Sequence, residues 1–142
     1  MVARLSRVAR IKKILIVDDD PSVRHVFRLI LESEGYEIAE AGHGEAALDL
    51  IRPDPLPLAV VIDLVMPILG GEELVRRLRS EPRTAAIPIV IVSSNPEAAQ
   101  SLLASGLVDA VVNKPFAAAG LAARIRAIAT DLLRDEPLED RA

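Results

Sequence analysis

Short runs of aliphatic residues alternate with amphipathic segments along most of the chain. Runs rich in Val, Ile, Leu and Ala are typical of strands that are buried on both faces of a parallel sheet. Segments whose apolar residues share helical spacing are typical of helices with one buried face. Strands are predicted over residues 14–17, 36–39, 58–62, 87–92 and 110–112, and helices over residues 21–34, 45–51, 72–79, 96–105 and 116–134.

Local signals support the ends of several predicted elements. Asp20 can cap the first helix, and Pro21 suits the first helical position. Gly35 and Gly106 suit helix ends, because glycine adopts the left-handed backbone conformation without strain. Prolines between residues 53 and 57 forbid regular structure there. The apolar face of the first helix consists of Val23, Val26, Phe27, Ile30 and Leu31.

Five strands that alternate with five helices predict the α/β class. Such elements form a doubly wound five-stranded parallel sheet with right-handed crossovers. Sheets of this kind bind ligands beyond the carboxyl ends of their strands. The residues that follow the predicted strands are therefore the first candidates for a functional site.

Composition narrows the classes of function. The chain has 142 residues, of which 51% are hydrophobic, and a formal net charge of −4. This length fits one domain, and this charge gives no general basic field for direct binding of nucleic acid. The absence of cysteine excludes disulfides and thiolate metal sites. A chain without cysteine suits a reducing compartment, and we expect a cytoplasmic protein. No apolar stretch reaches the roughly 18 residues that a membrane span needs.

The predicted domain occupies residues 11–134, between a basic N-terminal arm at residues 1–10 and a polar C-terminal tail at residues 135–142. The arm is either a frayed terminus or a contact for a membrane surface or an acidic partner. The tail is too short for a further domain, so we expect the chain to act through its own surface. His25 and His43 lie in no acidic or metal-like cluster of the sequence and are expected to be bystanders.

Polar residues gather where four of the five predicted strands end. Taken singly, an aspartate there forms a turn or a cap, and a serine forms a local turn. Taken together, several carboxylates at one edge repel each other and need a cation, and Mg²⁺ is a hard ion that prefers oxygen ligands. The residues concerned are Asp18, Asp19, Asp20, Asp63, Ser93, Ser94 and Lys114.

One feature of composition draws attention to Lys114. The 17 basic residues comprise 14 arginines and three lysines, and two of the lysines lie near the N-terminal arm. The rest of the chain otherwise uses arginine. Because lysine differs from arginine in carrying a compact point charge, Lys114 indicates a position that needs such a charge.

Asp63 is the candidate phosphoacceptor of this edge. An ionised carboxylate can attack phosphorus and form an acyl phosphate. Phosphoryl transfer needs charge neutralisation on the transferred oxygens, and little else from the protein. Mg²⁺, the Ser93 hydroxyl and the Lys114 ammonium can supply it from three sides. In this interpretation Asp19 binds the metal directly and Asp18 binds it through water.

Four motifs resemble the receiver domain of two-component response regulators, in particular a stand-alone, chemotaxis-regulator-like receiver. They are Ile-Leu-Ile-Val-Asp-Asp at 14–19, Asp-Leu-Val-Met-Pro at 63–67 with Gly71, Ile-Val-Ile-Val-Ser at 89–93, and Lys-Pro-Phe at 114–116. The resemblance covers residues 11 to 134. It implies a flavodoxin-like fold with strand order 2-1-3-4-5.

The resemblance also implies a function and its partners. A histidine kinase or a His-containing phosphotransfer protein would phosphorylate Asp63, with Mg²⁺ held by Asp19, Asp63 and the backbone carbonyl of Val65. Ser93 and Lys114 would bind the phosphoryl group. The chain would catalyse its own phosphorylation and dephosphorylation, yet act as a signalling protein on an unknown downstream protein. A homodimer through the last two helices and the fifth strand is a further expectation.

One departure from the family pattern, and two positions to which the resemblance assigns a role, affect the expected behaviour. Val111 stands where the family usually has an aromatic residue that rotates inward, and valine has too little volume for that switch. Val65 and Asn95 occupy the positions that flank the path of the attacking water. Val65 excludes water and Asn95 cannot act as a base, so we expect slow autodephosphorylation.

Other functions remain open from the sequence. A receiver fold can serve as a scaffold that is never phosphorylated, and Val111 mildly favours this reading. A haloacid-dehalogenase-type phosphatase would use Asp18 as nucleophile and Asp20 as general acid, but the chain is short for that class. An FMN-binding flavodoxin is less favoured, because the loop after the first strand lacks the Ser, Thr and Gly that hold a phosphate.

Overall fold

The computed structural model describes residues 13–53, 55–66, 68–114 and 117–134. The basic arm at 1–10, the tail at 135–142, and Pro115 with Phe116 lie outside the described residues, so the predictions made for them are not tested. Among the described residues, no helix is long and apolar enough to cross a bilayer.

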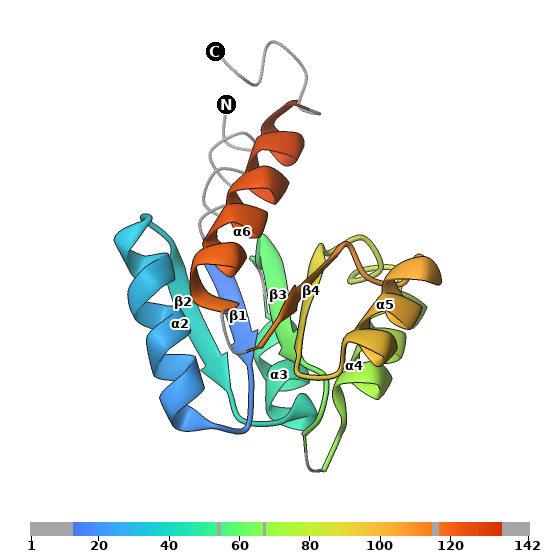
Figure 1. The fold of residues 1–142 in the computed structure, drawn as a ribbon. Coiled ribbons are helices and arrows are strands. Elements are labelled where there is room, and N and C mark those ends of the chain that lie inside the picture. Colours follow the sequence, from blue (N-terminus) through green and yellow to red (C-terminus); the bar gives the residue numbers. More distant parts are fainter. Residues whose placement is uncertain (1–12, 54, 67, 115–116, 135–142) are drawn as a thin grey trace.

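Five parallel strands form one sheet, and helices alternate with them along the chain (Figure 1). The sheet order is β2-β1-β3-β4-β5, which confirms the flavodoxin-like order expected from the resemblance. The strands are β1 (Lys13–Val17), β2 (Glu37–Ala41), β3 (Ala59–Asp63), β4 (Ile89–Ser93) and β5 (Ala110–Asn113). The helices are α2 (Pro21–Ser33), α3 (Gly44–Ile51), α4 (Gly71–Ser80), α5 (Pro96–Ala104) and α6 (Ala117–Arg134).

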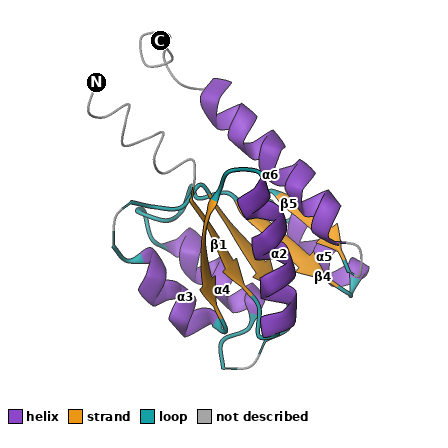
Figure 2. Ribbon diagram, turned by 90° about the vertical axis from the view of Figure 1, so that its left-hand side faces the viewer, coloured by secondary structure: helices purple, strands orange, loops and turns teal. Residues whose placement is uncertain are grey.

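Two hydrophobic layers enclose the sheet, because successive strand side chains point to opposite faces. On β1, Ile14 and Ile16 pack in the layer that contains Phe27 of α2 and Leu121 of α6. The alternate β1 residues pack in the layer formed by α3, α4 and α5. Figure 2 shows the helices on the two sides of the sheet. Burial on both faces explains why the central strands are continuous aliphatic runs.

Several boundaries differ from the predicted ones for local reasons. β4 begins at Ile89 rather than at residue 87, because Pro88 lacks the N–H that a strand ladder needs. β2 extends to Ala41, although Glu40 makes its end look polar. Helix α3 begins at Gly44, since the His43 ring accepts a hydrogen bond from the Ala46 amide at 3.2 Å and caps the helix. Gly35 and Gly106 have positive φ values, as predicted for helix ends.

An arginine joins several segments at the edge of the sheet where β4 begins. The Arg79 Nε donates to the carbonyl of Leu107 at 2.8 Å, and Nη1 donates to the carbonyls of Ala85 and Ile87 at 2.8 and 2.7 Å. Its Nη2 pairs with Asp109 at 3.1 Å. The guanidinium thus links the end of α4 with the segments that lead into β4 and β5.

Helix α4 starts against the end of β3, and Gly71 makes this approach possible. An ideal Cβ on Gly71 would lie 2.4 Å from the backbone oxygen of Asp63 and 2.8 Å from the Cα of Leu64. The Gly71 amide also donates to the Leu64 carbonyl at 3.1 Å. Any side chain at this position would therefore push α4 away from the strand end that carries Asp63.

We predict that Gly71→Ala lowers the free energy of unfolding by about 1–3 kcal/mol, because the added methyl group overpacks a backbone contact. Gly70→Ala is the matched control, since its Cβ would meet nothing closer than 4.0 Å. Urea unfolding followed by circular dichroism measures both variants. Equal losses in the two variants would contradict the proposed close approach.

Candidate functional site

The predicted strand-end residues come together at one edge of the sheet. Asp18 and Asp19 follow β1, Asp63 and Ser93 are the last residues of β3 and β4, and Lys114 follows β5. All five strands are parallel, so these ends share one edge. The sequence-based placement of the site is thus reproduced by the fold.

Three carboxylates form a cluster at this edge. One oxygen each from Asp18, Asp19 and Asp63 lies within 4.8 Å of the others. Asp18 is 1% exposed and Asp63 is 7% exposed, whereas Asp19 is exposed. Burial raises the pKa of both buried carboxyl groups above the ordinary value, and the charge of Asp18 raises that of Asp63 further.

Lys114 partly compensates the cluster. Its Nζ lies 3.5 Å from Asp18 Oδ2 and 3.4 Å from Asp63 Oδ1. Burial alone would lower the pKa of the Lys114 ammonium, but the two carboxylates outweigh that effect and raise it. Lys114 pairs with two of the three carboxylates of the cluster, so one ammonium leaves part of the negative charge uncompensated.

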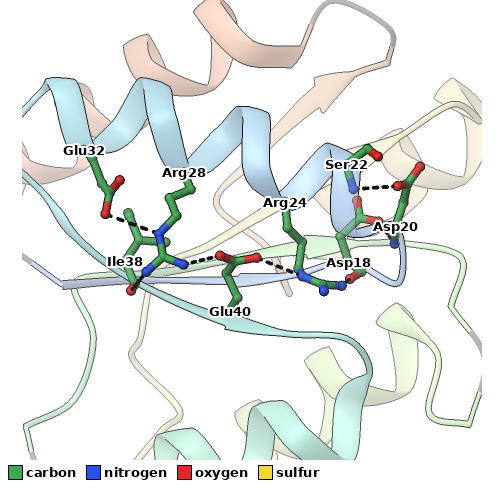
Figure 3. Close-up of polar contacts among 8 residues, drawn as sticks. All are labelled: Asp18, Asp20, Ser22, Arg24, Arg28, Glu32, Ile38 and Glu40. Atoms are coloured by element: carbon green, nitrogen blue, oxygen red, sulfur yellow. Dashed lines mark hydrogen bonds and ion pairs between the residues drawn. The ribbon is translucent and has the colours of Figure 1, made fainter.

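The backbone around Asp18 is fixed from several sides. Its amide donates to the carbonyl of Ala41 at 3.1 Å, and its Oδ1 accepts from the Asp20 amide at 2.9 Å. Asp20 itself caps α2 by accepting from the Ser22 amide at 2.8 Å, as predicted (Figure 3). Asp20 is therefore occupied at the helix start and does not belong to the carboxylate cluster.

The second carboxylate oxygen of Asp18 has no hydrogen-bond partner among the described residues. This oxygen, Oδ2, is buried and forms an ion pair with the Lys114 Nζ at 3.5 Å. Buried polar atoms normally have a partner, and a bound cation or an ordered water can provide one. The ligand atoms are all oxygens, which Mg²⁺ prefers to nitrogen or sulfur. The residues present thus fit a hard divalent cation.

Ser93 and Asn95 are engaged with each other and with α5. The Ser93 hydroxyl is 1% exposed, donates to the Asn95 carbonyl at 3.2 Å and accepts from the Asn95 amide at 2.9 Å. The Asn95 side chain caps α5 by accepting from the Ala98 amide at 3.2 Å. The ordinary local-turn explanation of Ser93 therefore describes this conformation, although the residue lies at the predicted edge.

Two apolar side chains on the loop after β3 are exposed to solvent. Val65 is 73% exposed and Ile68 is 76% exposed. Ile68 also has φ = 71°, a left-handed conformation that is unusual for a β-branched residue. Val111, in contrast, is half-buried and packs against the core layer of α3, α4 and α5.

The sequence did not predict the side chains that hold the backbone of Asp18 in place. Arg24 of α2 donates to the Asp18 carbonyl at 2.6 Å and pairs with Glu40 of β2 at 3.0 Å. An arginine facing a strand glutamate across 16 positions has no local signature. Its helical position, one turn after the cap, was the only signal available in the sequence.

Comparison with known proteins identifies the class to which this fold and site belong. Residues 14–126 match the family of response regulator receiver domains, so the chain belongs to this family. Phosphorylation on aspartate and use of Mg²⁺ are general features of the family.

Individual relatives agree with this assignment. Response regulator GtcR from Aneurinibacillus migulanus is 40% identical over 117 residues, which cover 82% of this chain and 47% of the relative. The chain spans about half the length of the curated relatives it matches.

Solved structures give the same result. A receiver domain of a signal transduction histidine kinase from Syntrophus aciditrophicus superposes with a TM-score of 0.77 at 27% identity, covering 89% of this chain and 96% of that one. Response regulator TrrA from Thermotoga maritima, solved in complex with Mg²⁺ and BeF, has a TM-score of 0.72 at 30% identity, covering 82% and 98%.

We predict that Asp19→Asn raises the melting temperature of the protein in a chelating buffer, because it removes one of three mutually repelling charges. Ionised carboxylates cause the repulsion, so the gain is largest at neutral pH. It fades as the pH falls through the raised pKa values of Asp18 and Asp63 and these groups bind protons.

Glu37→Gln is the matched control, since this exposed carboxylate at the start of β2 carries the same charge at the opposite end of the sheet. Thermal unfolding with excess chelator measures both variants. A similar gain in both would assign the effect to net charge and contradict repulsion within the cluster.

Proposed function

We propose that the chain is a phosphoacceptor that receives a phosphoryl group on Asp63 from a histidine kinase or a His-containing phosphotransfer protein. Mg²⁺ would be held by Asp19, Asp63 and the Val65 backbone carbonyl, with Asp18 bound through water. The observation that carries the proposal is the residual negative charge of the Asp18, Asp19 and Asp63 cluster beside Lys114.

The contacts of the carboxylates favour Asp63 as the nucleophile. Asp18 is the more deeply buried, and its Oδ1 is held by the Asp20 amide. A phosphatase of the haloacid-dehalogenase type would need Asp20 as general acid, but that side chain caps α2. Asp63 ends β3 next to the loop that carries Val65, and its Oδ1 lies 3.4 Å from Lys114.

The chain's own residues account for the transfer. A carboxylate oxygen of Asp63 attacks phosphorus, the P–N bond of the phosphohistidine breaks, and the electron pair returns to the imidazole ring. Lys114 neutralises developing charge from one side. The Ser93 hydroxyl can donate to the phosphoryl group once it releases the Asn95 carbonyl. When bound, Mg²⁺ supplies further charge neutralisation.

The signal would leave through the surface of the domain, by contact with a downstream protein in the cytoplasm. A net charge of −4 supports a protein partner rather than direct contact with nucleic acid. A homodimer through α5, β5 and α6 remains part of the proposal, and Leu103 of α5 is a partly exposed apolar residue on that side. Val111 is small and half-buried, so the proposed function does not include the family's inward-rotating aromatic ring.

The competing scaffold function has weaker support. A scaffold has no need for buried, repelling carboxylates, which destabilise a fold unless a ligand compensates them. The same edge would be expected to lose Asp18 or Lys114 in a protein that never binds phosphate. Both residues are present and in ion-pair contact.

We predict that Asp63→Asn abolishes labelling by acetyl phosphate in Mg²⁺, because the amide cannot act as the nucleophile. Intact-protein mass spectrometry measures the phosphoryl adduct. Asp18→Asn serves as the comparison: a reduced but detectable adduct that maps to Asp63 is expected. Labelling that persists in Asp63→Asn and disappears in Asp18→Asn would favour the phosphatase, and no labelling of the parent would favour the scaffold.

We predict that the aspartyl phosphate decays slowly and that Val65→Asn accelerates its hydrolysis. An amide can hold the attacking water in line, and positioning is a large part of such a barrier. An effect of about tenfold corresponds to lowering the barrier by about 1.4 kcal/mol. Val65→Ala is the matched control, since it shortens the same exposed side chain without adding a group that can hold a water.

Decay of the phosphorylated protein after removal of the donor measures the rate for the parent and both variants. An unchanged or slower decay in Val65→Asn would show that Val65 does not control access of water. Equal acceleration by Val65→Asn and Val65→Ala would indicate that loss of the valine side chain, rather than a water held by the amide, sets the rate.

A further inference from the structure

A chain of charged side chains runs from Glu32 through Arg28, Glu40 and Arg24 to the Asp18 backbone, between α2 and β2 (Figure 3). One carboxylate oxygen of Glu40 in β2 forms an ion pair with Arg24 at 3.0 Å, and the other oxygen forms an ion pair with Arg28. Arg28 also contacts Glu32 on its own helix and donates to the Ile38 carbonyl at 3.2 Å. The two arginines share Glu40 but hold different parts of the backbone.

Arg24 alone reaches the cluster in this network. Its Nη1 donates to the backbone carbonyl of Asp18 at 2.6 Å, while its Nε is fixed by Glu40. The β1 ladder ends at Val17, where the registers with β2 and β3 stop. The Asp18 carbonyl therefore lies beyond the sheet and takes its hydrogen bond from a side chain instead.

The peptide that contains this carbonyl sets the direction of Asp19. The Asp18 amide is held by Ala41 and the Asp18 side chain by the Asp20 amide. The bond from Arg24 adds a third constraint, on the plane of the peptide between Asp18 and Asp19. Asp19 is exposed, and its side chain makes no hydrogen bond with the other residues that the structure describes. The orientation of this carboxylate therefore depends on the backbone that carries it.

We propose that Arg24, oriented by Glu40, is a positioning residue for the cation site, because it fixes the peptide that presents Asp19. The proposal rests on the function proposed above, in which Asp19 binds Mg²⁺. Arg24 touches neither the cation nor the phosphoryl group in this role. It belongs to the outer layer of contacts that orient metal ligands, and loss of such contacts typically weakens metal binding by roughly 10–100-fold.

The charge of Arg24 makes the proposal testable, because the direction of the change in Mg²⁺ affinity distinguishes a positioning role from an electrostatic one. A guanidinium next to the cluster repels a divalent cation, so a purely electrostatic role predicts that its removal strengthens Mg²⁺ binding. A positioning role predicts that its removal weakens Mg²⁺ binding. The two explanations therefore predict opposite changes in the same dissociation constant.

The experiment compares Arg24→Met with Arg28→Met. Both variants remove a Glu40 ion pair and a hydrogen bond to a backbone carbonyl, but only Arg24 contacts Asp18. Calorimetric titration of the metal-free proteins with MgCl₂ gives the dissociation constants, and thermal unfolding gives the stabilities. We expect Arg24→Met to weaken Mg²⁺ binding by roughly 10-fold or more, and Arg28→Met to leave it unchanged, although both melt at lower temperature.

Arg24→Lys is a second variant that tests the same position if Arg24→Met does not fold. Lysine keeps the charge but lacks the fork that holds Glu40 and the Asp18 carbonyl together, so Mg²⁺ binding should still be weaker than in the parent. Parental or stronger binding in the folded Arg24 variants would overturn the positioning role while leaving the proposed function intact. Failure of the parent itself to bind Mg²⁺ would overturn both.

Discussion

Repulsion among the carboxylates of Asp18, Asp19 and Asp63 is the interaction around which the rest of this structure is organised. A parallel sheet with right-handed crossovers collects its strand ends at one edge, so side chains distant in sequence are forced together there. Two of the three carboxylates are buried, and Lys114 neutralises only part of their charge. The hydrophobic layers on both sides of the sheet must hold this edge together against that repulsion.

The sequence predicted those parts of the fold that depend on local or periodic signals. Aliphatic runs located the strands, and Asp20, Gly35 and Gly106 located helix ends. The same signals brought Asp63 and Lys114 to one edge, because topology alone places strand ends. The His43 cap was not predicted because histidine is not a usual N-cap residue, although the Ala46 amide that it accepts from is only three residues away. The contacts of Arg24 and Arg79 were not predictable, since each depends on which backbone group lies opposite the side chain in the folded chain.

Ser93 illustrates how an ordinary and a functional explanation apply to one residue. Its hydroxyl exchanges hydrogen bonds with the backbone of Asn95, whose side chain caps α5. A hydroxyl that turned toward a phosphoryl group would give up the bond to the Asn95 carbonyl at the start of that helix. In the proposed function, binding of the phosphoryl group would thereby be coupled to the position of α5 through Ser93, Asn95 and the helix cap.

The contacts of the Arg79 guanidinium, called the Arg79 clamp from here on, affect how fast different parts of the domain open. One guanidinium ties the end of α4 to segments that contain Ala85, Ile87, Leu107 and Asp109. Opening of the backbone there requires several bonds to break together, whereas the loop that holds Val65 and Ile68 has exposed apolar side chains and a left-handed residue. Amide hydrogen exchange should therefore be slow at the clamped edge and fast on that loop, so the sheet has a kinetically rigid end and a labile end.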